Sequence, residues 1–506
     1  MAGEAPFDLL IIGGGINGVG IARDAAGRGL SVLLLERGDL AGATSSASSK
    51  LIHGGLRYLE QGALRLVRES LAEREVLLAA APHLVRPLRF VLPVLRGARP
   101  AWMLRLGLML YDHLGGRERL APARRLTRGR DAELEPLQAA VHVGFEYSDC
   151  WTDDARLVVT NAIDARERGA RIEVGAAFQG ARREGALWRA QVSGGREVCA
   201  RAVVNAAGPW VQQVQRTLGR PGGAGLRRVK GSHIVVPRLY APECAYTLQN
   251  SDGRIIFTIP YEDEFTLVGT TDIPFEGDPE RVEASAAEVG YLCAAAERYL
   301  TRRVSPAQVC WSYAGVRPLH DSGELNASTV TRDYAFDLDA PPRAAPLLSV
   351  YGGKLTTYRR LAEHALAQLG PPLGARAAPW TRRAVLPGGD LANADLPAFV
   401  GALGREYPAL PAPLLARLAG AYGTRIERVL GGARNARALG EEIAPGLYEA
   451  ELQYLATEEW ARTAEDVLWR RSKLGLRSSA AARERVAAWL ARHSSRTPTA
   501  ARERQA

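Results

Sequence analysis

Short apolar runs alternate with a helical pattern at the start of the chain. Residues 7–12 form a compact apolar run, and a helical pattern over 21–26 ends at Gly27 and Gly29. Residues 31–35 are apolar after the first position, which is typical of a strand buried on both faces of a parallel sheet. The order strand, helix, strand predicts a βαβ unit at the N-terminus.

The pattern changes twice further along the chain. Residues 66–81 and 153–167 have helical periodicity, whereas 85–130 mixes Pro, Gly and Arg and predicts no single regular element. Extended runs dominate 229–332 and predict an antiparallel-sheet domain inserted into an α/β framework. From 390 to 489 the pattern is helical with short Pro and Gly breaks, which predicts a separate all-α module.

Composition is that of a folded protein with several domains. The chain has 506 residues, of which 47% are hydrophobic and 24% charged, and this length suggests two to four domains. The five cysteines are scattered, with no CxxC spacing. We therefore expect neither a disulfide framework nor a metal site.

No segment of the sequence predicts export or a membrane span. The N-terminus lacks a basic region followed by a cleavage pattern. The longest apolar block, 102–111, is interrupted by Arg105 and is shorter than the ~20 residues of a spanning helix. We expect an intracellular protein whose contact with a membrane is peripheral.

The net charge of +10 needs an explanation. Eleven arginines stand against only Asp112 and Glu118 between Arg86 and Arg130, so this block carries nearly all of the excess. Positive charge at this level suggests an anionic partner, which is nucleic acid, a membrane surface or an acidic substrate.

Lysine is rare, and its positions are therefore informative. Only Lys50, Lys230, Lys354 and Lys473 occur among 65 basic residues. Retention of a lysine in such a chain suggests a need for a compact ammonium group, although chance retention explains any single one equally well.

The first motif predicts a dinucleotide site. Gly13, Gly15 and Gly18 fit GxGxxG between a strand and a helix, and Glu36 ends the second strand. The glycines permit a tight turn and close approach to a pyrophosphate, the helix N-terminus attracts the phosphates, and the acid accepts ribose hydrogen bonds. An acid disfavours a 2′-phosphate, so FAD and NAD both fit.

The second motif is a loop rich in small hydroxyl residues at 43–51, followed by a histidine, two glycines and Arg57-Tyr58. Such a loop can wrap around a cofactor and donate many hydrogen bonds. A solvent-exposed serine-rich linker is the alternative.

Residues 48–59, Ser-Ser-Lys-Leu-Ile-His-Gly-Gly-Leu-Arg-Tyr-Leu, resemble the signature of FAD-dependent, aerobic-type glycerol-3-phosphate dehydrogenases. Five further segments and the helical module resemble that family in order and spacing: 205–210, 230–233, 315–318, 331–334 and 352–358. The resemblance covers nearly the whole chain and implies FAD rather than NAD.

The family resemblance implies a fold class and domain boundaries. The fold class is α/β: a Rossmann-like FAD-binding domain, an inserted antiparallel-sheet substrate domain and an all-α C-terminal domain. The expected ranges are 1–80, 150–228 and 345–385 for the FAD-binding domain, 81–149 and 229–344 for the substrate domain, and 386–506 for the helical domain.

The resemblance also implies a reaction. Oxidation of sn-glycerol 3-phosphate to dihydroxyacetone phosphate delivers a hydride to FAD and electrons onward to a membrane quinone. His53 is the first choice for the base, because its ordinary pKa suits proton transfer near neutral pH. His233 is the second choice, and Arg317 could stabilise a developing oxyanion.

Two groups of residues are expected to hold the ligands. The substrate group consists of Ser49, Arg57, Tyr58, Thr270, Arg317, Arg332 and Lys354. The cofactor group consists of Gly13, Gly15, Ile16, Asn17, Gly18, Glu36, Arg37, Thr44, Ser45, Ser48, Ser49, Lys50, Leu51, Ala207, Gly208, Gly352, Gly353, Lys354 and Thr357.

Two alternatives differ in the electron acceptor and in the partner. A glycerol-3-phosphate oxidase would pass electrons to O₂ and form hydrogen peroxide, but the likeness is closer to the quinone-reducing enzymes. A nucleic-acid-binding flavoprotein would explain the charge, but the sequence has no zinc finger, helix-turn-helix or aromatic RNP pattern. We therefore expect no nucleic acid partner.

The arginine-rich block lies outside the predicted substrate group. Because a quinone is lipid-soluble, this block predicts peripheral binding to an anionic bilayer at the inner face of the cytoplasmic membrane. The block also offers apolar area beside its arginines, from Trp102, Met103, Leu104, Leu106, Leu108, Met109 and Leu110. A buried helix flanked by solvated arginines is the alternative.

The oligomeric state stays open, with a homodimer as one option.

Overall fold

The predicted βαβ unit is confirmed at the N-terminus. A computed structural model describes residues 5–60, 62–95, 100–116, 118–220, 225–321, 333–374 and 378–494. In it β1 (Phe7–Ile12) leads into α1 (Ile16–Gly27) and then β2 (Val32–Glu36). β1 and β2 are parallel and almost fully buried, as their uninterrupted apolar sequences predict.

The first sheet assembles strands that are far apart in the sequence. Its order is β17-β18-β10-β1-β2-β7, parallel from β18 to β7, with β17 antiparallel at the edge and the hairpin β8-β9 attached to β10. The added strands are β7 (Arg171–Val174), β8 (Phe178–Glu184), β9 (Leu187–Val192), β10 (Arg196–Asn205), β17 (Ala335–Asp339) and β18 (Leu347–Tyr351). This topology brings the carboxyl ends of β1, β2 and β10 to one edge, where open α/β sheets bind ligands.

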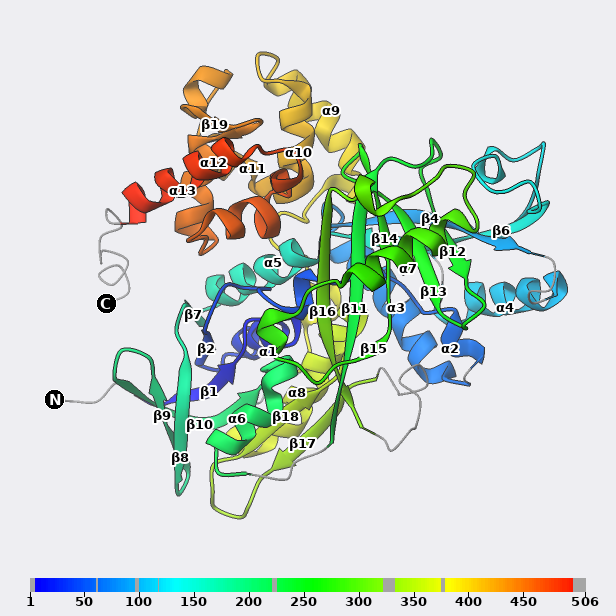
Figure 1. Ribbon diagram of the computed structural model, residues 1–506. Coiled ribbons are helices and arrows are strands. Elements are labelled where there is room, and N and C mark those ends of the chain that lie inside the picture. The colour runs from blue at the N-terminus through cyan, green and yellow to red at the C-terminus, as the bar shows by residue number, and fades with distance from the viewer. Residues whose placement is uncertain are drawn as a thin grey trace.

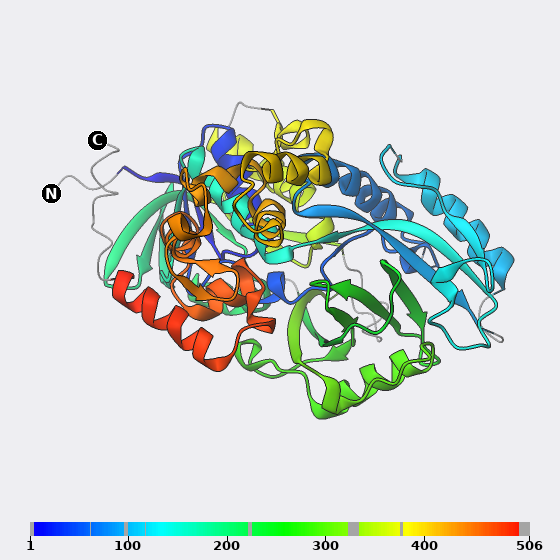
Figure 2. The ribbon, with the colours of Figure 1, turned by 90° about the horizontal axis from the view of Figure 1, so that it is seen from above.

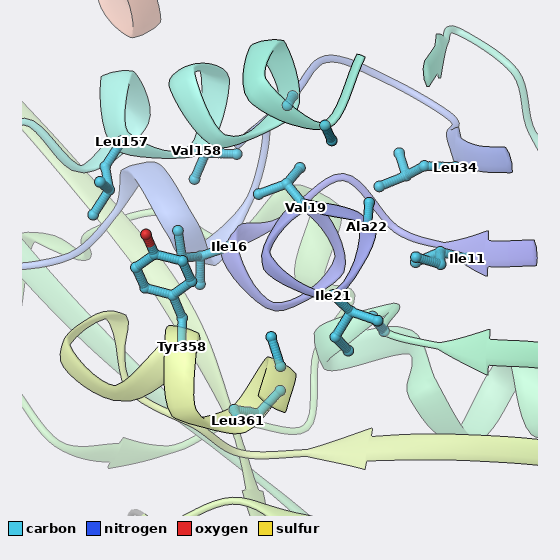
Figure 3. Close-up of a cluster of buried hydrophobic side chains, with 14 of the residues drawn as sticks. Ile11, Ile16, Val19, Ile21, Ala22, Leu34, Leu157, Val158, Tyr358 and Leu361 are labelled. Carbon is cyan, nitrogen blue, oxygen red and sulfur yellow. The ribbon is translucent and has the colours of Figure 1, made fainter. Parts of the chain in front are cut away.

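A layer of helices covers one face of this sheet. α1 packs between α5 (Asp154–Glu167) and α8 (Tyr358–Leu373). Figure 3 shows the interface, with Val19 of α1 facing Val158 of α5 and Ile21 facing Leu361 of α8. The apolar stripe of each helix is buried here, which stabilises the layer.

The second sheet is built mainly from the inserted region. Its order is β15-β11-β14-β13-β12-β4-β6-β3, with β16 paired to β11 and β5 to β6. The strands are β3 (Leu51–Ile52), β4 (Val85–Val94), β5 (Arg124–Thr127), β6 (Val143–Thr152), β11 (Leu226–Pro237), β12 (Cys244–Gln249), β13 (Ile255–Tyr261), β14 (Phe265–Gly269), β15 (Ile273–Pro274) and β16 (Trp311–His320). Helix α7 (Ala286–Glu297) packs on one face of it, and α2 (Arg57–Glu60), α3 (Leu64–Ala80) and α4 (Ala101–Leu114) lie nearby (Figure 1).

The segment 85–130 supplies several elements to the second sheet region. In agreement with the expectation that it forms no single regular element, it contains β4, α4 and β5. β4 pairs antiparallel with β6 along its whole length in spite of Pro87 and Pro93. The partner strand lies some 50 residues away, so local sequence could not reveal the pairing.

The helical domain follows as predicted. It contains α9 (Leu396–Glu406), α10 (Ala412–Tyr422), α11 (Ile426–Leu430), α12 (Glu449–Glu458), a π-helical turn (Asp466–Arg471) and α13 (Ala480–Ser494), with a short hairpin of β19 (Glu442–Ala444) and β20 (Leu447–Tyr448). Figures 1 and 2 show this domain beside α5, at the opposite end of the molecule from α4.

Two absences hold for the described residues. No helix among them is long and apolar enough to cross a membrane. They also contain no group of His, Cys, Asp and Glu side chains that could hold a metal ion.

Candidate active site

One cavity lies at the carboxyl ends of β1, β2 and β10, and a second cavity adjoins it. The first, of about 1,020 Å³, runs from Glu36 past Ala207 and Gly208 to Gly352 and Gly353. The second, of about 800 Å³, lies between the two sheets and reaches α4. They share eight lining residues, so they form one continuous site: Ile16, Thr44, Ser45, Ala47, Gly315, Pro318, Gly352 and Gly353.

The glycine loop has no room for side chains. Gly13 has φ +113°, and a Cβ there would lie 2.6 Å from the carbonyl oxygen of Ala206. A Cβ on Gly18 would lie 1.9 Å from the carbonyl oxygen of Gly13. The loop therefore forms a bare backbone turn at the N-terminus of α1, where N–H groups and the helix dipole favour phosphate.

Glu36 lies at the ribose end of the first cavity. Its carboxylate accepts hydrogen bonds from the backbone N–H of Gly14 and Gly38, both at 2.7 Å. Burial raises the pKa of Glu36, and the two backbone donors oppose that shift. These bonds orient the carboxylate at the cavity wall, where its remaining lone pairs can accept ribose hydroxyls.

Arg37 connects two domains across the cavity entrance. Its guanidinium lies 4.2 Å from the ring centroid of Trp210 and forms an ion pair of 2.5 Å with Glu280. Both of those residues also line the first cavity. Arg37 therefore shapes the rim of the cavity.

The hydroxyl-rich loop uses its side chains to hold its own backbone in place. Ser45 Oγ accepts from the N–H of Ile16 at 3.0 Å, and Thr44 Oγ1 donates to the carbonyl of Val316 at 2.7 Å. Ser48 Oγ donates to Asp154 at 2.7 Å. These side chains thus bond to protein, and the same residues line the cavities. Their predicted contact with the cofactor stays a prediction.

Lys50 also holds the hydroxyl-rich loop in place, from inside the protein. Its ammonium is fully buried and donates to both oxygens of Asp154, at 2.9 and 3.0 Å, and to the carbonyl of Ser46 at 3.1 Å. Burial lowers the pKa of Lys50, and the charge of Asp154 opposes that shift. Lys50 thus anchors the loop to α5, which gives a reason for a compact cation at this position. Lys50 also lines the first cavity, and its contact with the cofactor stays a prediction.

The second cavity gathers most of the predicted substrate residues. Its lining includes Ser49, His53, Arg57, Tyr58, Thr270, Arg317 and Lys354, together with Ser48, Leu51 and Gly353. Arg332 lies outside the described residues. Thr357 is buried below the lining of both cavities, at the start of α8; its neighbour Thr356 faces the second cavity instead.

Arg317 is oriented by residues from a neighbouring strand end. It forms an ion pair with Asp272, and its Nη2 donates to Thr270 Oγ1 at 3.1 Å. Asp272 also lines the cavity. The carboxylate keeps the guanidinium fixed at the wall, so a planar donor points at the cavity without rearrangement.

Lys354 and Tyr58 form a second polar group. The Lys354 ammonium lies 3.9 Å from the ring centroid of Tyr58, which is a cation–π contact. Arg57, at the start of α2, lines the same cavity. Three cations therefore border one compartment, which suits a phosphate dianion.

His53 is positioned by its backbone. Its N–H donates to Thr356 Oγ1 at 3.3 Å, and its ring meets Phe257 edge-on with centroids 6.2 Å apart. The next N–H, of Gly54, donates to Tyr111 Oη at 2.8 Å, and Tyr111 donates to buried Asp149 at 2.7 Å. The loop that carries the imidazole is thereby fixed to α4 and β6.

His233 lies one layer behind the cavity. It is 1% exposed, its Nε2 lies 2.9 Å from Ser49 Oγ, and its ring stacks on Tyr313 at 4.8 Å. Burial lowers the pKa of His233 well below its ordinary value, and Arg317 and Lys50 lower it further. His233 therefore holds Ser49 as a neutral group and does not line the cavity.

Sequence reasoning missed the residues that support the site. Asp272, Thr356, Tyr111 and Asp149 belong to this group. Two of them gave a signal: Thr270-Thr271-Asp272 is a polar triplet directly after the extended run 265–269, and Thr356 lies in the motif 352–358. Tyr111 and Asp149 act through contacts with residues distant in sequence.

The first cavity fits an extended dinucleotide. A bare glycine turn at a helix N-terminus suits a pyrophosphate, and a carboxylate in the position of Glu36 suits a ribose. The buried Asn17 Oδ1 has no hydrogen-bond partner among the described residues, while Asn17 Nδ2 donates to the carbonyl of Gly352 at 3.1 Å. An unpartnered acceptor beside two positive-φ glycines, Gly352 and Gly353, suits a ring system with N–H donors.

Comparison with known proteins agrees with this geometry. Residues 8–341 match a family model described as FAD dependent oxidoreductase, and residues 379–500 match the C-terminal domain of alpha-glycerophosphate oxidase. The chain is 52% identical over 489 residues to a glycerol-3-phosphate dehydrogenase of Pseudomonas aeruginosa, covering 96% of this chain and 95% of that one.

Two more relatives and one solved structure complete the comparison. A D-erythritol 1-phosphate dehydrogenase of Brucella abortus is 49% identical (97% of this chain, 98% of that one). The aerobic glycerol-3-phosphate dehydrogenase of Escherichia coli is also 49% identical (96% and 97%). The structure of a Bacillus halodurans glycerol-3-phosphate dehydrogenase complexed with FAD superposes with TM-score 0.78 at 29% identity, covering 98% of this chain and 92% of that one.

Proposed function

The chain belongs to the family of FAD-dependent glycerol-3-phosphate dehydrogenases, and from this premise we propose that it oxidises sn-glycerol 3-phosphate to dihydroxyacetone phosphate and passes the electrons to a membrane quinone. The observation that carries the proposal is the second cavity. It places Arg57, Arg317 and Lys354 around one compartment that adjoins the FAD cavity and contains His53.

The substrate phosphate binds to the three cations in this assignment. Arg317 and Arg57 offer paired donors to phosphate oxygens, and Lys354 supplies a point charge. Thr270, already hydrogen-bonded to Arg317 at 3.1 Å, adds a neutral hydroxyl. A phosphate held in this way fixes the distance of the substrate carbon C2 from the flavin.

Chemistry at C2 requires removal of a hydride and a proton. FAD, held by the glycine turn and the other residues of the first cavity, would supply the hydride acceptor. His53 takes the proton of the C2 hydroxyl, so that the C–H and O–H bonds break as the C=O bond forms. Arg317 stabilises negative charge on that oxygen. His233 keeps Ser49 in place and is a positioning residue in this mechanism.

The apolar part of the second cavity supports a quinone as the electron acceptor. Its apolar part reaches α4, where Met103, Leu106 and Leu110 line it. Trp102 and Met109 of the same helix are 68% and 56% exposed. We infer that α4 docks the protein on the inner face of the cytoplasmic membrane, from which a lipid-soluble acceptor can reach the site.

Anaerobic addition of sn-glycerol 3-phosphate to the purified yellow protein tests the first half of the proposal. Rapid loss of flavin absorbance is expected, and an unchanged spectrum would contradict it. Stopped-flow reoxidation then tests the acceptor. Reoxidation by a quinone analogue much faster than by O₂ is expected, whereas fast reoxidation by O₂ alone would identify an oxidase.

D-Erythritol 1-phosphate is a second candidate substrate, because one relative at 49% identity bears that name. Both compounds present a hydroxyl carbon and a phosphate to the same set of cations. The same anaerobic experiment with each compound at equal concentration separates them. The faster flavin reduction identifies the preferred polyol phosphate.

A further inference from the structure

One wall of the FAD cavity comes from the helical C-terminal domain. Six residues of that domain line the cavity: Arg462, Thr463, Glu465, Asp466, Trp469 and Arg470. They lie in and just before the π-helical turn Asp466–Arg471. No dinucleotide-binding motif includes them, and no sequence pattern predicts that they lie beside the cofactor.

Ion pairs attach this wall to the nucleotide-binding strand. Asp39, shortly after β2, accepts from Arg470 Nε at 2.6 Å and from Arg471 Nη2 at 2.7 Å. Arg471 is 1% exposed and also donates to the carbonyl of Glu459 at 2.8 Å. Buried charges persist only when paired, so these contacts hold the helical domain against the strand that ends in Glu36.

Trp469 reaches the opposite side of the cavity. Its ring stacks on Trp311 with centroids 4.3 Å apart, and both rings line the FAD cavity. Trp311 begins β16 of the second sheet. The helical domain therefore contacts both other domains across the cavity and closes it between them.

Arg462 lies at the adenosine end of the cavity. A Cβ on Gly175 would be 2.0 Å from Arg462 Nη1, so the guanidinium packs directly over that glycine. Gly175 follows β7, and Val174 of β7 pairs with Glu36, the expected ribose acceptor. Within the described part of the chain Arg462 forms no ion pair, so its guanidinium is available to stack on an adenine or to bind a phosphate.

We propose that the helical domain is a structural part of the FAD site and retains the cofactor by covering its adenosine half. Arg462 contacts the adenosine diphosphate portion, and the Trp469–Trp311 stack keeps the domain closed. FAD then enters or leaves only when this contact opens. The inference requires the FAD site alone and no particular substrate.

Binding of FAD and ADP to flavin-free protein tests the role of Arg462. Arg462→Ala should raise the Kd of both ligands about tenfold, the effect of one lost charge-assisted contact. Arg434→Ala, an exposed arginine elsewhere in the same domain, is the matched control and should leave both Kd values unchanged. An FAD Kd within twofold of wild type, or a loss for FAD without a loss for ADP, would overturn the proposal.

The rate of FAD release from the holoenzyme tests the closure by Trp469. Trp469→Ala should release FAD at least tenfold faster, while Trp469→Phe keeps a stacked ring and should release it at nearly the wild-type rate. Equal release from wild type and both variants would contradict closure by the helical domain. Flavin reduction by glycerol 3-phosphate is measured separately, at saturating FAD, so a failure of the proposed reaction and a failure of this inference give different results.

Discussion

His53 is the residue on which the proposed chemistry depends most. His53→Asn keeps a polar side chain that can hydrogen-bond but removes the base, so turnover should fall about 10²- to 10⁴-fold while FAD absorbance is retained. Steady-state assays with a quinone analogue measure this. His364→Asn, a histidine that is hydrogen-bonded to Tyr334 outside both cavities, is the control. Wild-type turnover in His53→Asn would remove His53 from the mechanism.

A buried histidine outside the site sets a pH limit on stability. Burial, with a smaller effect of Arg156, lowers the pKa of His83 to about 3. Because His83 binds a proton more weakly in the folded than in the unfolded protein, protonation favours unfolding. The unfolding free energy is therefore highest above the unfolded pKa of about 6.5 and decreases as the pH falls toward 3.

The corresponding variant is His83→Gln. The unfolding free energy of wild type minus that of the variant should fall by about 1.4 kcal/mol per pH unit between pH 6 and pH 4. Urea denaturation at several pH values measures it, with His142→Gln, an exposed histidine, as control. A pH-independent difference for His83→Gln would show that His83 is protonated in the folded protein.

At the scale of single residues, the sequence located groups that meet ligands better than groups that support them. Arg317 and His53 stood out within motifs, and both line the second cavity. Their partners Asp272 and Thr356 were not identified as partners, because an ion pair or a hydrogen bond across 45 or 303 positions leaves no local pattern. Ser48 and Lys50 show that a motif residue can also hold the loop itself, through its bonds to Asp154.

Helix α4 carries most of the large apolar side chains that are exposed on the described surface. It exposes Trp102 and Met109, and Arg105 lies on the exposed surface between them. Other arginines of the basic block are structural: Arg124 pairs with Asp131 at 2.7 Å and Arg128 donates to the carbonyl of Val141 at 2.8 Å. For binding to a membrane, apolar contact through α4 should therefore contribute more than the net charge of the basic block suggests.

Vesicle binding measures this directly. The double variant Trp102→Asp/Met109→Asp should lose at least tenfold in affinity for anionic vesicles in a sedimentation assay. Neither side chain lines the second cavity, so flavin reduction should be unchanged. Leu338→Asp, an exposed apolar residue on β17, is the control. Equal sedimentation of the double variant and wild type would contradict docking through α4.

Element by element, regular patterns were predictable and long-range pairing was not. The βαβ unit, α3 and α5 follow from periodicity alone. β4 contains two prolines, and only its alignment with β6 makes it a strand. The extended runs of β11 to β14 predict the inserted sheet, whereas the pairing of β4 and β6 with it depends on contacts between segments far apart in the chain.

Across the whole molecule, the helical domain is joined to the FAD-binding half by buried charges. Glu459 is 0% exposed and pairs with Arg156, and Arg471 lies 3.8 Å from it. Removal of one member of a buried pair leaves uncompensated charge, which costs about 3–5 kcal/mol.

Glu459→Gln should lower the unfolding free energy by this amount. Glu406→Gln, which alters an exposed pair with Arg434 of 3.7 Å, should change it by less than about 0.5 kcal/mol. Urea titration of both holoenzymes compares them. A loss for Glu459→Gln no larger than that of the surface variant would mean that the interface does not depend on this pair.

The position of the cavity wall in the chain bears on how the protein is made. Every strand and glycine turn around the cofactor, up to Gly353, precedes the wall residues 462–470. On a ribosome that adds about 5–20 residues per second, the nucleotide-binding half is synthesised several seconds before the segment that covers it. The newly made chain thus presents an open FAD site first and the cover last, so the natural time for flavin loading is during synthesis, before the last helices have emerged.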